Sequence, residues 1–481
     1  MSLLFHSPEF LSLLAVTVTV YYTFPRARLY LLALANALFY AVAGLPWLGL
    51  FVAMALLTYL ASKRAQPDLG PSARRWVWLG VTANLLNLGF FKYTNFVFQS
   101  LNRYLHLTAD SKLISVILPI GISFYTFQLI AYLVDVGRGR QRPSRSFLEF
   151  WVFISFFAHL VAGPIMRAKD FLPQVENADQ VRFNTGEFKY GLYLLLMGMA
   201  KKVILADTLA PLADSRFAAG TSIGALSAWV AAYLFTFQIY FDFSAYSDMA
   251  LGIGHLFGFR LTQNFFTPYL SDGPREFWQR WHVTLSTWIR DYVYIPLGGS
   301  RVKVPRQLFN LILAMTLSGL WHGAAWTFAA WGLYHGVLAA VERLYRKHVE
   351  TPVAGTGLGR RVVTSWVYRA ASVFAWFHLT VIGWVFFRAP TITQALVMIK
   401  HMVLLRPLGF SYSELAMVGF AGLLFIGHAL ERVVREHEVR VHDVWRRLVP
   451  TPARALFYAA AVVLVATFMK GKEAAFIYFR F

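Results

Sequence analysis

The sequence contains no cysteine, and only 14% of its 481 residues are charged. The absence of cysteine excludes disulfide bonds, a cysteine nucleophile, a thiolate metal site and palmitoylation of the chain. The shortage of charge excludes an ordinary soluble protein, in which about 25% of residues are charged. Instead, 57% of the residues are hydrophobic and 17% are aromatic, and the mean hydropathy is +0.51. We therefore predict an all-α, polytopic integral membrane protein.

The few charges that are present are mostly basic, with 45 Lys and Arg against 24 Asp and Glu. The basic residues cluster in short segments between apolar stretches, at 26–28, 63–75, 137–145, 342–369 and 431–447. This is the positive-inside pattern of membrane proteins, so the charge reports topology and not binding to nucleic acid. It predicts about eleven spans in a bacterial inner membrane, with both termini outside the cytoplasm.

The organisation along the chain indicates one membrane domain over 1–481. We expect N-terminal spans in 1–146, a catalytic core in 147–345 and C-terminal spans in 346–481. The first apolar segment has no Lys or Arg before Arg26, so we interpret it as a retained span and not as a signal peptide. Residues 100–112 are predicted to form an outer loop. Two further stretches are predicted to form re-entrant or interfacial helices. The first, 268–304, is rich in Trp, Arg, Asp and Tyr, and the second, 391–405, is only moderately apolar and contains Lys400 and His401.

An apolar hairpin around His322 is the most informative segment. Its first arm, 308–320, is shorter than the about 20 residues that a span requires. A break at Gly319 and Gly323 would place His322 deep in the membrane layer. Because an imidazole there is costly without a function, we interpret His322 as a reaction centre. Other histidines on apolar helices, such as His159, His255 and His335, are expected to be satisfied core residues.

Two carboxylates, Asp242 and Asp248, lie in the aromatic run 238–254. Their spacing places them on different faces of a helix unless the helix breaks between them. One interpretation is structural, namely helix capping or pairing with arginines of 275–301. The other places them in the wall of a catalytic cavity, or behind a histidine that they orient.

The segment 276–299 combines tryptophans, arginines and His282 within one amphipathic stretch. Arg280 and Arg290 have two open interpretations, either binding of donor phosphates or pairing with neighbouring acids. The glycine turn at 297–301 is weak evidence for a phosphate cradle on its own. The candidates for substrate or donor contacts in these three segments, the aromatic run included, are Asp242, Ser286, Arg280, Arg290, Trp278, Trp281, Asn310 and Trp321.

These motifs, taken in order, resemble the membrane-bound O-acyltransferase (MBOAT) family. The motifs are Phe-Phe-Thr-Pro-Tyr at 265–269, Phe-Trp-Gln-Arg-Trp-His at 277–282, Arg-Asp-Tyr-Val-Tyr-Ile-Pro-Leu-Gly-Gly at 290–299 and Leu-Trp-His-Gly-Ala at 320–324, together with 238–254, 162–165, 5–10 and 478–481. The subgroup that they resemble most is AlgI-like, which O-acetylates alginate and has relatives in cellulose acetylation and teichoic acid D-alanylation. The run 156–159 departs from the proline-bearing run expected there.

The resemblance implies a ring of helices around a central tunnel, with His322 at its centre and His282 on its cytoplasmic side. It implies an acyl thioester donor, expected to be acetyl-CoA, and no bound cofactor or metal. The implied acceptor is an exported polysaccharide, reached directly or through an extracytoplasmic SGNH esterase-like partner beside the polysaccharide export machinery. Membrane lipid is the remaining expected partner.

Acyl transfer to a hydroxyl requires a base and a group that stabilises the oxyanion. Without cysteine, a neutral histidine is the best base near pH 7, and we expect His322 to accept the hydroxyl proton. An acyl-imidazole intermediate on His322 is the alternative to direct transfer. His282 would then orient the thioester or protonate the departing thiolate. Two other functions stay open at this point, a transporter of polysaccharide or lipid-linked sugar and a structural subunit of a polymer synthase.

Overall fold

The computed structural model describes residues 5–105, 117–469 and 476, and every regular element in this part is helical. The predicted helical class is therefore confirmed for the described residues. Residues 106–112 of the predicted outer loop and the motif at 478–481 lie outside them, and the prediction of a loop at 100–105 is wrong, because these residues continue the helix that begins at Ser72. The chain forms two compact units, which we describe separately: unit 1 (1–198 and 246–263) and unit 2 (199–245 and 264–481).

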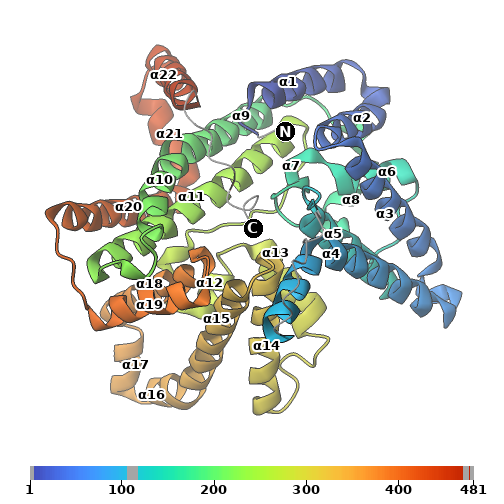
Figure 1. The fold of residues 1–481 in the computed structure, drawn as a ribbon. Helices are drawn as coiled ribbons and strands as arrows, with labels where there is room; N and C mark the ends of the chain where they lie inside the picture. The colour runs from blue at the N-terminus through green and yellow to red at the C-terminus, as the bar shows by residue number, and fades with distance from the viewer. Residues whose placement is uncertain (1–4, 106–116, 470–475, 477–481) are drawn as a thin grey trace. The chain divides into compact units, whose positions relative to one another are not determined.

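Unit 1 contains the N-terminal helices (Figure 1). They are α1 (Pro8–Thr23), α2 (Arg28–Ala41), α3 (Leu45–Arg64), α4 (Ser72–Leu105), α5 (Ile122–Gly137), α6 (Phe147–Ser155), α7 (Phe157–Leu160), α8 (Ala168–Glu176), most of α9 (Thr185–Ala200) and the last turns of α11 (Ala225–Leu256). Short 3-10 turns lie at Pro25–Ala27, Pro67–Leu69 and Ala178–Gln180. Ser7 caps α1 by accepting the backbone N–H of Phe10 at 3.2 Å, and Pro25 marks the sharp bend of 117° between α1 and α2.

Within this unit, α6 packs against α2 and α3. Its aromatic core includes Phe51, whose ring lies 4.5 Å from Tyr125 and 5.0 Å from Trp151 between ring centroids. The chain breaks between α6 and α7 without a proline. The side chain of Asn36 accepts the backbone N–H of Phe157 at 3.3 Å there and satisfies the group that the break exposes.

Unit 2 contains the remaining helices. They are the π-helix η4 (Lys201–Ala206), α10 (Asp207–Phe217), the first part of α11, α12 (Pro274–Trp278), α13 (Val283–Ile289), the π-helix η7 (Arg290–Tyr294), α14 (Val304–His322), α15 (Trp326–Tyr345), the π-helix η8 (Arg346–Glu350), α16 (Thr351–Ala354), α17 (Gly357–Val363), α18 (Trp366–Arg388), α19 (Ile392–Leu404), α20 (Tyr412–Glu436), α21 (Glu438–Leu448) and α22 (Thr451–Met469), with 3-10 turns at Gly220–Ser222 and Pro268–Leu270. As predicted, 268–304 forms mainly short helices, and α19 has only 13 residues.

Within the described residues, four helices are long and apolar enough to cross a membrane: α3, α18, α20 and α22. The bent pair of α1 and α2 is a fifth if the two helices cross together. Several other helices are too polar or too short for this criterion, so the number of about eleven spans stays a prediction. Helix α11 is 32 residues long and buried along nearly all of its length, which identifies it as a core helix.

Candidate active site

The candidate site lies in unit 2, where His322 ends α14. The chain breaks at 323–325, and α15 begins at Trp326. The break at Gly323 was predicted, and it sets the imidazole among aromatic rings. The ring centroid of His322 lies 5.1 Å from Trp321, 5.1 Å from Trp331 and 5.4 Å from Phe387, and the residue is only 3% exposed.

The predicted break at Gly319 is wrong, because α14 continues through this residue. Gly319 instead lies where α14 packs against α15, which run side by side in Figure 1. A methyl group on Gly319 would overlap the carbonyl oxygen of Phe328, and one on Gly332 would lie 2.8 Å from the Cα atom of Thr316. Small residues allow such a close approach of helix backbones in membranes. The glycines therefore fix the hairpin that carries His322.

His282 lies beside His322, with 6.3 Å between the two ring centroids. Its backbone is left-handed (φ 42°) at the start of α13, a conformation that costs energy outside glycine and is concentrated at functional sites. Its Nδ1 lies 3.2 Å from Asn264 Oδ1. The backbone N–H of Thr284 donates to the same atom, so this atom is the amide oxygen and His282 Nδ1 carries the hydrogen. The acceptor nitrogen of His282 is therefore Nε2. Sequence reasoning missed Asn264.

A cluster of tryptophans surrounds both histidines and a third one, His335. Trp331 contacts His322 on one side and His335 on the other, with 5.0 Å between the centroids of Trp331 and His335. Trp278 lies 5.4 Å from His335, and Trp281 packs against Trp384 at 4.9 Å. The predicted residues Trp278 and Trp281 thus lie in one aromatic cluster, in which the side chain of Trp281 is fully buried.

His335 differs from an ordinary core histidine. It is completely buried, yet in the described part of the chain neither of its ring nitrogens has a hydrogen-bond partner. The same holds for the indole nitrogens of Trp278 and Trp331. Leaving a buried polar group unsatisfied costs about 1–3 kcal/mol, so these groups call for a ligand or water. The prediction that His335 is a satisfied core residue is therefore wrong for its hydrogen bonds. No signal in the sequence indicates this, because His335 has the spacing of a core residue.

Charged residues gather at the other end of this cluster, around α12. Glu276 pairs with Arg280 at 2.7 Å and with Arg369 at 3.4 Å. Burial alone would raise the pKa of the Glu276 carboxyl, but the backbone N–H of Asp272 and the charge of Arg280 hold it below its usual value. Arg290 pairs with Asp291 at 2.8 Å and is 59% exposed. Both arginines therefore have acidic partners, as one of the two sequence interpretations proposed.

Asp242 has a different partner from the arginines that the sequence suggested. Its carboxylate lies 2.9 Å from the Nζ atom of Lys202, which also lies 2.8 Å from Asp207. Lys202 belongs to the π-helix η4, which carries this side chain into the interior, where it is 4% exposed. Asp242 and Asp248 lie on one unbroken helix, α11. Because they are six residues apart, they lie on different faces of this helix, as predicted.

The remaining predicted residues have structural partners. The side chain of Asn310 donates to the carbonyl of Leu297 at 2.9 Å and holds the glycine turn at 297–301, where Gly298 and Gly299 both have positive φ angles. The hydroxyl of Ser286 donates to the carbonyl of Trp281 at 3.3 Å. Trp321 contacts His282 with 6.1 Å between centroids. Within the described residues, no group of three or more His, Asp or Glu side chains is arranged to hold a metal ion.

Comparison with known proteins assigns the chain to a family. The profile of the MBOAT, membrane-bound O-acyltransferase family, matches residues 78–387, a range that includes His282, His322 and His335. A protein of Azotobacter vinelandii described as a probable alginate O-acetylase, AlgI, is 41% identical over 82% of this chain and 76% of its own length.

More distant relatives act on other envelope polymers. The peptidoglycan O-acetyltransferase of Helicobacter pylori is 37% identical over 77% of this chain and 73% of its own length. The teichoic acid D-alanyltransferase of Streptococcus thermophilus is 27% identical over 56% of this chain and 68% of its own length. These matches decide against a transporter or a purely structural subunit. The chain belongs to the membrane-bound O-acyltransferase family, in its AlgI-like subgroup, and is a multi-pass membrane O-acyltransferase.

Proposed function

We propose that this enzyme transfers an acyl group, acetyl in the first instance, from a cytoplasmic thioester to a hydroxyl outside the cytoplasm. The acceptor is an exported polysaccharide, or an extracytoplasmic esterase-like partner that passes the group on. The relatives that act on alginate, peptidoglycan and teichoic acid support an acceptor of this class. Acetyl-CoA is the proposed donor, the bacterial inner membrane the proposed location, and both termini lie outside the cytoplasm in this proposal.

The observation that carries the proposal is the continuous cluster of buried rings around His322. His282 adjoins it at 6.3 Å, and Trp331 connects it to His335. Trp278 contacts His335 and belongs to α12, which also carries Glu276, the partner of Arg280. The predicted topology places the end of α15 near residue 345 on the cytoplasmic side. In this proposal the cluster extends from the cytoplasmic side to His322.

His322 acts as the general base in this proposal. The hydroxyl proton of the acceptor moves to a ring nitrogen of His322 while the hydroxyl oxygen bonds to the thioester carbonyl carbon. The tetrahedral intermediate then collapses, the carbon–sulfur bond breaks, and the proton passes to the departing thiolate. The products are an ester and a free thiol, so protons and charge balance. His282 positions the thioester by accepting a hydrogen bond from a donor amide at Nε2, since its Nδ1–H donates to Asn264.

His335 and the two tryptophans beside it contact the donor in this proposal. Acyl thioesters of the coenzyme A type carry amide groups that both donate and accept hydrogen bonds. The indole N–H groups of Trp278 and Trp331 and the ring of His335 have no partner within the described residues, so they are available to such amides. The enclosing rings exclude water, which protects the thioester from hydrolysis.

The test replaces His322 by Ala in a host strain that lacks its own copy of the gene. We expect ester-linked acetate on the exported polysaccharide to disappear while the amount of protein in the membrane stays normal. The matched control is His378→Ala, because His378 is another imidazole on a membrane helix but contacts Tyr233 and the carbonyl of Phe374. Unchanged acetylation in the His322→Ala strain would remove His322 from the reaction.

A second measurement separates direct transfer from a covalent intermediate. Membranes are incubated with acetyl-CoA that carries a labelled acetyl group, without acceptor, and the protein is isolated under denaturing conditions. Direct transfer predicts no label on His322. Stable label on this residue that is lost in His322→Ala would favour the acyl-imidazole path instead.

A further inference from the structure

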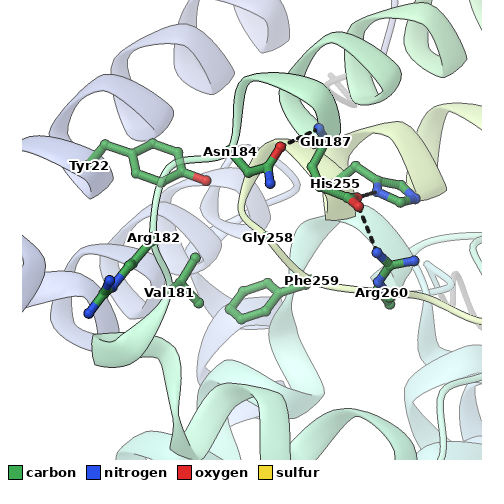
Figure 2. Close-up of a pocket in the computed structure, with 9 residues that line it drawn as sticks. All are labelled: Tyr22, Val181, Arg182, Asn184, Glu187, His255, Gly258, Phe259 and Arg260. Carbon is green, nitrogen blue, oxygen red and sulfur yellow. Dashed lines mark hydrogen bonds and ion pairs between the residues drawn. The ribbon is translucent and has the colours of Figure 1, made fainter.

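Unit 1 contains a hollow of about 250 Å³ that the acyl-transfer chemistry does not use (Figure 2). It lies where the end of α1, the start of α9 and the end of α11 meet. The residues that line it are Tyr22, Val181, Arg182, Asn184, Glu187, His255, Gly258, Phe259 and Arg260. We call it the α1–α9 hollow. All nine residues belong to unit 1.

The polar groups of the hollow carry an excess of positive charge. Arg260 and His255 contact the two carboxylate oxygens of Glu187, each at 2.7 Å, and thereby occupy this single acid. Arg182 also lines the hollow and has no ion pair with the residues that the structure describes. In Figure 2, Arg182 and Arg260 lie on opposite sides. The hollow is therefore lined by two arginines and one carboxylate, and this excess of positive charge favours an anionic ligand.

Hydrogen bonds and a close packing contact hold the walls of the hollow in place. The backbone N–H of Arg260 donates to the side chain of Gln174 at 2.8 Å, which fixes this part of the wall. Asn184 caps the start of α9 by accepting the backbone N–H groups of Gly186 and Glu187 at 2.8 and 3.1 Å. Gly258 has a φ angle of +75°, and an added Cβ atom would run into the side chain of Val181.

Apolar walls complete the hollow. Tyr22, Val181 and Phe259 line it. Phe183, which packs edge-on against Tyr22 at 5.1 Å, is 54% exposed and extends the apolar surface outward. A ligand that matches this arrangement has an anionic group and an adjoining apolar part. A phospholipid has both, whereas a small inorganic anion has only the first.

The position along the chain places this hollow at the cytoplasmic surface. Tyr22 lies at the end of α1, just before the basic segment 26–28 that the positive-inside rule assigns to the cytoplasm. Arg28, which is 4% exposed, donates to the carbonyls of Ala178 and Val181 at 2.9 and 2.7 Å and ties this segment to the wall. The cytoplasmic leaflet carries anionic lipids, and basic pockets between membrane helices on this side bind their head groups.

We propose that the α1–α9 hollow binds the phosphate of an anionic phospholipid, such as phosphatidylglycerol, from the cytoplasmic leaflet. Arg260 donates to the phosphate oxygens, Arg182 attracts the anionic head group by its charge from the opposite side of the hollow, and Tyr22, Val181 and Phe259 contact the glycerol backbone and the start of the acyl chains. The bound lipid joins α1 to the ends of α9 and α11 and stabilises unit 1. This site does not depend on the proposed acyl-transfer mechanism.

The test uses the full-length protein, purified in detergent and depleted of lipid, with binding followed by native mass spectrometry and thermal unfolding. We expect phosphatidylglycerol to bind and to raise the unfolding temperature more than phosphatidylcholine, which has the same phosphate but no net charge. Arg182→Gln should weaken phosphatidylglycerol binding by about fivefold, the effect of one surface arginine near anionic lipid. The matched control is Lys169→Gln, because Lys169 is exposed on α8 and does not line the hollow.

Three results would overturn the proposal. Equal binding of phosphatidylglycerol by the wild type and Arg182→Gln would show that the lipid binds elsewhere. Equal weakening by Lys169→Gln would show a general charge effect. Displacement of the lipid by inorganic phosphate or coenzyme A at the same concentration would show that the hollow holds a soluble phosphate compound and not a lipid.

Discussion

Replacement of Gly332 by Ala should loosen the hairpin that carries His322. Gly332 lies on α15 against the backbone of α14. A Cβ atom there would lie 2.8 Å from the Cα atom of Thr316, and it would overlap the carbonyl oxygen of Met315. Backbone atoms cannot rotate away as side chains do, so the two helices must move apart.

The size of the effect follows from these distances. Carbon atoms in contact are separated by about 3.5–4.0 Å, so the helices must separate by about 1 Å at this point. Overpacking of this kind costs about 1–3 kcal/mol. The higher helix propensity of Ala offsets at most about 1 kcal/mol of this cost. We expect a net loss of about 1–2 kcal/mol, and a fall in activity of about a hundredfold if His322 moves by a similar distance.

The assay is thermal unfolding of the purified protein together with acetate transfer in membranes. The control is Gly422→Ala on α20, where an added Cβ atom meets nothing within 4 Å. This variant should be fully active and as stable as the wild type or slightly more stable. Gly422→Ala and Gly332→Ala should therefore change the stability in opposite directions. If Gly332→Ala does not accumulate in the membrane, Gly336→Ala provides a milder test, because its nearest neighbour, the Cα atom of Ile312, lies 2.9 Å away.

The reasoning is refuted if Gly332→Ala unfolds at the same temperature as the wild type and retains its activity. Such a result would mean that α14 and α15 do not approach as closely as their glycines allow. A loss of activity without a loss of stability would support the placement of His322 but contradict the packing cost.

Two other predictions concern buried polar groups. Lys202→Met should lower the free energy of unfolding by about 3–5 kcal/mol, because it removes the ammonium group beside Asp242 and Asp207. Asp242→Asn should lower it by less, because Lys202 still pairs with Asp207. Equal unfolding temperatures of the two variants would contradict this order. His335→Leu should preserve or raise the unfolding temperature, because it removes two buried nitrogens that have no partner in the described part of the chain. The same substitution should lower the rate of acyl transfer and raise the KM for the donor. Normal kinetics would show that His335 is a core residue only.

The sequence by itself determined the features that depend on local pattern. Composition identified a helical membrane protein, since too few charges are present for a soluble surface. The order of the motifs identified the family, and Gly323 marked the break that follows His322. The short helices of 268–304 and the short α19 were also predicted, because helix length and amphipathic spacing are read from neighbouring residues.

Only the tertiary structure decided which distant residues meet. Lys202 and Asp242 are paired because a π-helix carries the lysine inward, and no spacing rule predicts a partner that far along the chain. Asn264, which orients His282, and Gly319, which is a packing contact and not a break, were found the same way. Burial and hydrogen bonding depend on which helices pack together, so a one-dimensional pattern identifies the candidate histidines but not the groups that position them.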